Sequence, residues 1–243
     1  MAEQDRAYVW QLLDHSSDYG ALVHTELMNL VRAPPRLVLD VGCGLAANGV
    51  FLKERFPSCR VMGVEPVDGM AVRAAKQLDH VFNCRFEDID LSAAGVQPGE
   101  IDLVIFSDVL EHMYHPWKIL QETKPMMSQD GVVVASIPNI RHIGVINELV
   151  KGDWNYHRYG ILDITHIRFF TRLGVERLFS ETGYRVDELI PRIDPNLQQL
   201  VDRIQDHTDR IDLEYCELRK LKKTDLIELL TLQFLVRASP ITS

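Results

Sequence analysis

The stretch that decides the fold is Leu37-Val38-Leu39-Asp40-Val41-Gly42-Cys43-Gly44-Leu45-Ala46-Ala47. An apolar run of strand length ends in an acid and two glycines, and a helical pattern follows from about residue 46 to residue 56. Gly42 and Gly44 let the backbone come close to a ligand, while the amide N–H groups at the helix start point outward. The stretch therefore predicts a strand, a tight turn and a helix N-terminus that suit a nucleotide-like ligand.

The spacing of these glycines leaves two ligand classes open, because Gly42, Gly44 and Ala47 also fit the G-x-G-x-x-G/A pattern of dinucleotide-binding proteins. About twenty residues on, a second predicted strand ends in Glu65, whose carboxylate can accept both hydroxyl hydrogens of a ribose. Glu87, in an acidic turn after a third apolar run, can accept a hydrogen bond from an exocyclic amine. Together these positions predict a ligand that contains a nucleoside.

Strand-like and helix-like runs alternate along the chain. Strands are predicted at 37–41, 60–65, 80–86, 101–106, 131–137, 184–190 and 231–237, with helical windows at 67–78 and 116–127. This alternation predicts an α/β fold: a Rossmann-like, doubly wound, mostly parallel seven-stranded sheet that binds ligands at the carboxyl ends of its strands.

Four parts are expected along the chain: an N-terminal helical cover (1–35), a core (36–192), a helical insertion (193–230), and a closing strand with its tail (231–243). The cover rests on helical periodicity over 7–31, with the apolar positions Tyr8, Leu12, Leu22, Leu27 and Leu30. In the insertion, seven residues alternate by four and three: Leu197, Val201, Ile204, Thr208, Ile211, Tyr215 and Leu218. That spacing predicts a long helix or a helical hairpin, which packs on its own domain, covers the acceptor or forms a homodimer interface.

The composition narrows the class of protein. The 243 residues are 46% hydrophobic and carry a formal charge of −9 without a long basic run, which disfavours nucleic acid as a partner. The four cysteines form no C-x-x-C pair, so neither a structural zinc site nor a disulfide framework is expected. Since no apolar run reaches membrane-spanning length, we expect a cytoplasmic protein without a membrane span.

Residues 19–192 resemble the class I S-adenosylmethionine-dependent methyltransferases. The resemblance rests on three segments, 38–44 (Val-Leu-Asp-Val-Gly-Cys-Gly), 63–66 (Gly-Val-Glu-Pro) and 106–112 (Phe-Ser-Asp-Val-Leu-Glu-His). Asp40, two residues before the first glycine, is typical of that family and not of the dinucleotide fingerprint. Residues 136–139 and 160–171 are similar to a bacterial subgroup that acts on small molecules, some members of which are fused to glycosyltransferases.

This resemblance implies that S-adenosylmethionine binds at the turn. The residues that it assigns to the donor are Asp40, Gly42, Cys43, Gly44, Glu65, Pro66, Phe86, Glu87, Ser107 and Asp108. One departure from the family pattern lies in the turn itself, where the usual third glycine is Ala46. Its methyl group stands where the methionine tail of the donor usually passes.

The resemblance also implies in-line transfer of a methyl group to a hydroxyl of a small-molecule or sugar-containing acceptor. A hydroxyl is a poor nucleophile, so a histidine base is expected. His166 ranks first because it lies in the segment Asp163-x-Thr165-His166-x-Arg168, and His112 and His142 are the other candidates. An N-methyltransferase is the nearest alternative, and a nicotinamide-dependent oxidoreductase or a non-catalytic donor-binding protein is less favoured.

The acceptor site is expected after the fifth predicted strand. Trp154, Tyr156 and Tyr159 can form an aromatic wall there, and Arg168 can hold an anionic group. A different interpretation concerns Asp108, Glu111 and His112, whose i, i+3, i+4 spacing would place them on one helical face. Such a face can bind a divalent cation, as a similar Glu-x-x-Glu-His motif suggests for some quinone-pathway methyltransferases, but lining of the donor pocket is favoured over a metal site.

Overall fold

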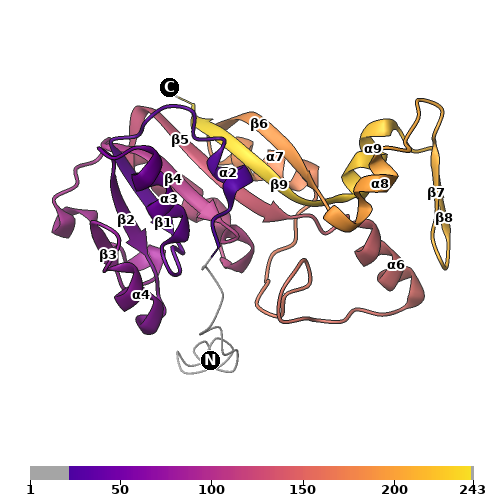
Figure 1. Ribbon diagram of the computed structural model, residues 1–243, viewed down its shortest axis with the longest axis horizontal. Helices are drawn as coiled ribbons and strands as arrows, with labels where there is room; N and C mark the ends of the chain where they lie inside the picture. Colours follow the sequence, from indigo (N-terminus) through magenta and orange to yellow (C-terminus); the bar gives the residue numbers. More distant parts are fainter. Residues whose placement is uncertain (1–21, 242–243) are drawn as a thin grey trace.

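The computed structural model describes residues 22–241 (Figure 1), and its centre is a seven-stranded sheet in the order β3-β2-β1-β4-β5-β9-β6. The strands are β1 (Leu37–Val41), β2 (Arg60–Val64), β3 (His80–Phe82), β4 (Ile101–Ser107), β5 (Met127–Pro138), β6 (Tyr184–Ile193) and β9 (Thr231–Pro240). The first five strands of the chain are parallel, and β9 runs antiparallel between β5 and β6. The predicted mostly parallel, seven-stranded α/β sheet is confirmed.

Helices α2, α3, α4, α5 and α7 cover the two faces of this sheet. The helices of the described residues are α2 (Thr25–Met28), α3 (Ala47–Arg55), α4 (Asp68–Ala74), α5 (Pro116–Thr123), α6 (Ile143–Lys151), α7 (Arg172–Glu181), α8 (Gln198–Val201) and α9 (Lys223–Leu229). One apolar cluster joins α2, α3 and α4 to the sheet, and a second joins α5 and α7 to its other face. In β1, Val38 belongs to the first cluster and Leu39 to the second, because successive side chains of a strand point to opposite faces.

Several predicted elements are shorter than expected. β3 ends at Phe82, and Phe86 instead begins the 3-10 turn η1 (Phe86–Asp88). Of the predicted N-terminal helix, positions 7–21 lie outside the described residues, and α2 is a single turn. Leu27 and Leu30 are buried as predicted, whereas Leu22 is 85% exposed, so its place in a buried stripe was wrong.

The prediction of a long helix between β6 and β9 was wrong. This insertion holds the turn η5 (Pro195–Leu197), the short helices α8 and α9, and a hairpin of β7 (Arg210–Asp212) and β8 (Glu217–Arg219). Both hairpin strands read polar, apolar, polar, which is a period of two, and Ile211 pairs with Leu218 across them. The four-and-three spacing of the apolar residues therefore runs through several short elements.

Figure 1 shows α6, α8, α9 and the hairpin gathered at one end of the molecule. Side-chain contacts connect them: Glu214 N donates a hydrogen bond to Asn147 Oδ1 of α6, and Arg141 forms ion pairs with Asp225 and Glu228 of α9. The loop from α6 to α7 returns to the sheet, where Ile140 N donates to Phe170 O. Among the helices of residues 22–241, none is long and apolar enough to cross a bilayer.

Candidate active site

The glycine turn lies between β1 and α3 and is fastened to the neighbouring strand. Gly42 N and Cys43 N both donate to Val64 O, at 2.8 and 3.1 Å. Gly42 and Gly44 have φ angles of +67° and +55°, which favour glycine, and a Cβ atom at Gly42 would lie 2.7 Å from a methyl of Val109. Gly42 is exposed, so the backbone of the turn is open to a ligand from solution.

Glu65 lies at the end of β2, beside this turn, as the sequence predicts. Its Oε2 accepts a hydrogen bond from Gly44 N and its Oε1 one from Val67 N, both at 2.9 Å. Burial raises the pKa of this carboxyl, and the two backbone hydrogen bonds oppose that rise. The carboxylate thus closes one side of the turn.

A second acid, Asp40, lies behind the turn. It is 1% exposed, and its Oδ2 is buried without a hydrogen-bond partner among the described residues. Burial and the charge of Glu65 raise the pKa of Asp40 to about 7. Two buried carboxyl groups at one turn favour a ligand that brings positive charge, because a cation stabilises both ionised forms.

Ala46 departs from the glycine pattern in identity but keeps a backbone conformation that favours glycine. It is fully buried and precedes α3 with φ +71° and ψ +17°, a left-handed conformation that costs an alanine about 1–2 kcal/mol. The first turn of α3 has no side-chain cap from this residue. The turn therefore holds strain at the position where the family pattern described above has its third glycine.

The other residues assigned to the donor differ in their surroundings. Pro66 and Glu87 are exposed, whereas Phe86 is buried with its ring centroid 6.3 Å from that of Phe106. Cys43 is buried, which raises the pKa of its thiol. Ser107 ends β4.

Asp108, which follows β4, has φ +55°, and its backbone N donates to Ser136 Oγ. Gln233 Nε2 donates to Asp108 Oδ1, and burial raises the pKa of the Asp108 carboxyl. The conformation breaks the chain direction just before η3 (Leu110–His112), so the predicted helical face of Asp108, Glu111 and His112 is not formed.

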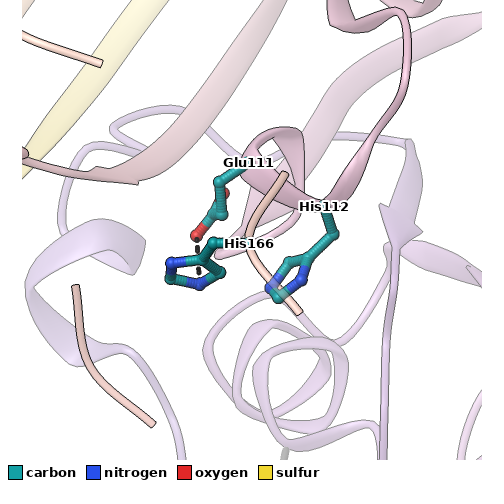
Figure 2. Close-up of side chains that lie close together, drawn as sticks. All are labelled: Glu111, His112 and His166. Atoms are coloured by element: carbon teal, nitrogen blue, oxygen red, sulfur yellow. Dashed lines mark ion pairs between the residues drawn. The ribbon is translucent and has the colours of Figure 1, made fainter. Parts of the chain in front are cut away.

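A cluster of three side chains lies after β4: Glu111 and His112 from η3, and His166 from the loop between α6 and α7. Each offers one potential ligand atom, and these atoms lie within 4.8 Å of one another. In Figure 2 the Glu111 carboxylate points at the His166 ring, and the His112 ring lies beside it. We call these residues the Glu-His-His cluster; it contains His166 where the sequence suggested Asp108.

Backbone contacts hold the two parts of the cluster together. Ile167 N and Arg168 N both donate to Glu111 O at 3.0 Å. The Arg168 guanidinium donates to Tyr114 O, so this predicted anion-binding residue also fastens the loop to the segment after η3. The loop conformation therefore places His166 next to Glu111.

Glu111 is the most enclosed member of the Glu-His-His cluster. It is 1% exposed, and neither carboxylate oxygen accepts a hydrogen bond from residues 22–241. His166 Nε2 lies 3.9 Å from Glu111 Oε1, beyond hydrogen-bonding distance. Burial, and then the charges of Asp108 and Asp163, raise the pKa of Glu111 well above its ordinary value.

The ring orientations of the two histidines are set by acceptors. His166 Nδ1 lies 2.9 Å from Ile161 O, and His112 Nδ1 lies 3.0 Å from Thr165 Oγ1 and 3.2 Å from Thr165 O. A carbonyl oxygen only accepts, and the Thr165 hydroxyl gives its hydrogen to Asp163, so both Nδ1 atoms carry the hydrogen and both Nε2 atoms keep a lone pair. Thr165 is held in turn by Asp163, whose Oδ1 accepts from its hydroxyl at 2.6 Å.

His142 does not join this cluster. Its Nδ1 accepts a hydrogen bond from Gly144 N and so caps α6, while its Nε2 lies 3.4 Å from Asp194 Oδ2 in the insertion. Burial lowers the pKa of His142, and Asp194 opposes that change. The residue connects α6 to the insertion.

Two of the predicted wall residues form an aromatic group. The Trp154 ring makes edge contacts with Tyr156 and Phe169, at centroid distances of 6.4 and 5.7 Å. Tyr159 is 77% exposed and has no ring contact among the described residues. The sequence interpretation missed Phe169 and the pairing of Glu111 with His166, although the motif Asp163-x-Thr165-His166 signalled that this segment is organised around polar contacts.

Comparison with known proteins gives a consistent class. A family model described as a methyltransferase domain matches residues 9–189. The malonyl-[acyl-carrier protein] O-methyltransferase of Geobacter sulfurreducens is 24% identical over 155 residues, which are 64% of this chain and 58% of that protein. The trans-aconitate 2-methyltransferase of Methylobacterium nodulans is 25% identical over 139 residues, or 57% and 51%. The match thus spans somewhat more than half the length of these relatives.

Among solved structures, the Burkholderia thailandensis 1,6-didemethyltoxoflavin-N1-methyltransferase has the same fold. That structure, with bound 1,6-didemethyltoxoflavin and S-adenosylhomocysteine, superposes with a TM-score of 0.53 at 13% identity. The superposition covers 98% of this chain and 84% of the other.

Proposed function

Because this chain belongs to the methyltransferase family whose model matches residues 9–189, we propose that it methylates an oxygen of a small-molecule acceptor. The class itself, an S-adenosylmethionine-dependent methyltransferase of class I, is the one that the sequence predicts, and the comparisons confirm it. S-adenosylmethionine supplies a methyl group on a sulfonium, whose leaving group needs no protonation. The protein chiefly has to bind, align and deprotonate the acceptor.

The acid pair at the glycine turn is the observation that carries the proposal. S-adenosylmethionine is a cation with a ribose, and Asp40 and Glu65 complement both features: the carboxylates offset its charge, and Glu65 accepts from ribose hydroxyls. A nicotinamide dinucleotide instead brings a negatively charged pyrophosphate to such a turn. Buried Asp40, which the dinucleotide pattern lacks, disfavours that ligand, and this argues against the oxidoreductase alternative.

Donor binding is tested by calorimetry on the whole chain. We expect S-adenosylmethionine and S-adenosylhomocysteine to bind, and Glu65→Ala to weaken them by about 10–100-fold, because a charged hydrogen-bond acceptor is lost. Glu54→Ala, at an exposed position of α3, is the matched control and should bind like the wild type. Binding of nicotinamide dinucleotides alone would overturn the proposal.

For the acceptor, we propose that its hydroxyl or carboxyl oxygen meets the Glu-His-His cluster, with His166 giving the largest effect on turnover. The two relatives named above, an O-methyltransferase and a trans-aconitate 2-methyltransferase, support an oxygen acceptor. The rings of Trp154 and Tyr156 offer apolar contact. The guanidinium of Arg168, which donates to Tyr114 O two residues after His112, can attract an anionic group of the acceptor. His142 is proposed to act by positioning α6.

An acceptor screen separates this proposal from N-methylation. Sugars, nucleotide sugars, phenols, carboxylic acids and amines are each incubated with labelled donor, and the methylated atom is identified by mass spectrometry and NMR. We expect oxygen products, and loss of turnover in His166→Ala with donor affinity retained. Methylated amines as the sole products would support the N-methyltransferase alternative.

The proposal extends to the insertion and to the location of the protein in the cell. We propose that residues 193–230 form a cover over the acceptor side or a homodimer interface, and light scattering on the whole chain distinguishes monomer from dimer. A reducing, cytoplasmic location is supported by the four cysteines, all of which are free thiols.

A further inference from the structure

We propose that Glu111, His112 and His166 bind a divalent transition-metal ion, of the kind represented by Zn²⁺, which coordinates the acceptor oxygen. The three ligand atoms lie within 4.8 Å of one another and come from two segments more than fifty residues apart. Binding of the ion requires only the three side chains and can be tested without donor or acceptor. The claim that the ion coordinates the acceptor oxygen rests on the proposed function.

The first support is the side chain of Glu111. Its carboxyl group is 1% exposed and accepts no hydrogen bond from the part of the chain that the structure describes. Such a group is costly to bury, and native proteins rarely keep one without a partner. Its Oε1 faces His166 Nε2 at 3.9 Å. Two ligand atoms of one zinc ion lie about 3–4 Å apart, since each is about 2.0–2.2 Å from the metal.

The second support is the hydrogen bonding of the imidazoles. A metal-binding histidine usually donates its other N–H group to a carbonyl or carboxylate, which fixes the ring and its tautomer. His166 Nδ1 is placed on Ile161 O, and His112 Nδ1 is placed on Thr165 O. Asp163 accepts hydrogen bonds from the backbone N and the hydroxyl of Thr165, so it helps to orient His112 through Thr165.

The donor set selects the kind of ion. Two imidazoles and one carboxylate suit zinc and its first-row neighbours, whereas Mg²⁺ and Ca²⁺ prefer oxygen ligands alone. Three protein ligands leave coordination positions for an outside oxygen, as in catalytic zinc sites. An acceptor hydroxyl bound there loses its proton more readily: the O–H bond breaks, the electron pair stays on oxygen and the proton passes to water.

The test is calorimetric titration of the chelator-treated, full-length protein with Zn²⁺ alone, in the absence of donor and acceptor. We expect one ion per chain, and visible absorption of Co²⁺ as a spectroscopic probe of the same site. Glu111→Gln should weaken Zn²⁺ binding by at least about 100-fold. Thr165→Val should weaken it by about 10–100-fold, because it removes the hydroxyl that lies 3.0 Å from His112 Nδ1 and helps to orient that ring. His115→Gln, at an exposed position three residues after His112, is the matched control and should bind as the wild type does.

Thermal unfolding distinguishes the loss of a metal ligand from misfolding of the variant. Without metal, Glu111→Gln should melt at the same temperature as the wild type or higher, because it replaces a buried carboxyl group that accepts no hydrogen bond from the described residues. Zn²⁺ should raise the melting temperature of the wild type and leave that of the variant unchanged. Absence of Zn²⁺ binding, equal affinity in Glu111→Gln, or a lower melting temperature of the metal-free variant would each overturn the inference.

These outcomes also separate the inference from the proposed function. If the protein binds donor and methylates an oxygen without binding Zn²⁺, the metal site fails and the proposed function stands. If Zn²⁺ binds at Glu111 and no donor binds, the site stands and the proposed function fails.

Discussion

The region proposed to bind the donor and the region proposed to meet the acceptor, called here the donor side and the acceptor side, are built in different ways. On the donor side, contacts of the glycine turn join residues close to one another in the chain, such as Gly44 with Glu65, at the ends of neighbouring parallel strands. On the acceptor side, contacts join distant segments, such as Glu111 with His166 and Arg141 with Glu228. The first side thus depends on a short motif, and the second on how a loop and an insertion pack onto the sheet.

The largest expected effect breaks the acceptor side alone. Buried Asn139 donates to Glu228 O and Thr231 O and accepts from Arg141 N, and so ties the insertion to the end of β5. Asn139→Ala leaves these groups without partners, and we expect a loss of about 3 kcal/mol of unfolding free energy, measured in urea. Acceptor turnover should fall more than donor affinity.

Exposed Asn155→Ala is the control for this substitution and should change stability by less than about 0.5 kcal/mol. If Asn139→Ala weakened donor binding as strongly as turnover, the two sides would not be separable.

A smaller effect is expected in the pH dependence of donor binding, through Asp40. The pKa of Asp40 is raised to about 7 in the free protein, and a cationic ligand favours the ionised form. Protonated Asp40 must lose its proton on binding, so affinity for S-adenosylmethionine should rise with pH, by about eightfold between pH 6 and pH 7.5. The quantity to measure is the calorimetric affinity of the wild type relative to Asp40→Asn, which cancels titration of the ligand.

The same raised pKa has an opposite consequence for folding. Between about pH 4 and pH 7 the folded protein binds a proton at Asp40 that the unfolded chain has released. The contribution of Asp40 to stability is therefore present at low pH and is lost as pH rises toward 7. For donor binding, a ratio of wild-type to Asp40→Asn affinity that stays constant between pH 6 and pH 7.5 would show that the ionisation of Asp40 is not coupled to the donor.

The smallest expected effect concerns Ala46. Ala46→Gly relieves a left-handed conformation worth about 1–2 kcal/mol, but loses a buried methyl and gains chain entropy in the unfolded state. The net change in stability should stay within about 1 kcal/mol, with equal or tighter donor binding. Ala47→Gly, one position later in α3, should only destabilise, by about 0.5–1 kcal/mol. Weaker donor binding in Ala46→Gly would show that the methyl contacts the donor.

Much of the donor side could be predicted from the residues alone. The positions of Gly42, Gly44 and Glu65 follow from strand length and from the rule that parallel strands end at one edge of the sheet. The insertion could not be predicted in this way. Its apolar spacing fits a long helix, yet cross-strand pairing of Ile211 with Leu218 and the turn at Pro195 make short elements more favourable.

The sequence by itself determined the alternation of strands and helices, the glycine turn and its acids, because these depend on local periodicity and on backbone conformations that few residues adopt. Only the tertiary structure decided that Glu111 meets His166, that Asp108 turns to Gln233, and that His142 faces the insertion. Such contacts depend on the path of a loop whose ends are far apart in the chain. The spacing of residues along a sequence does not carry that information.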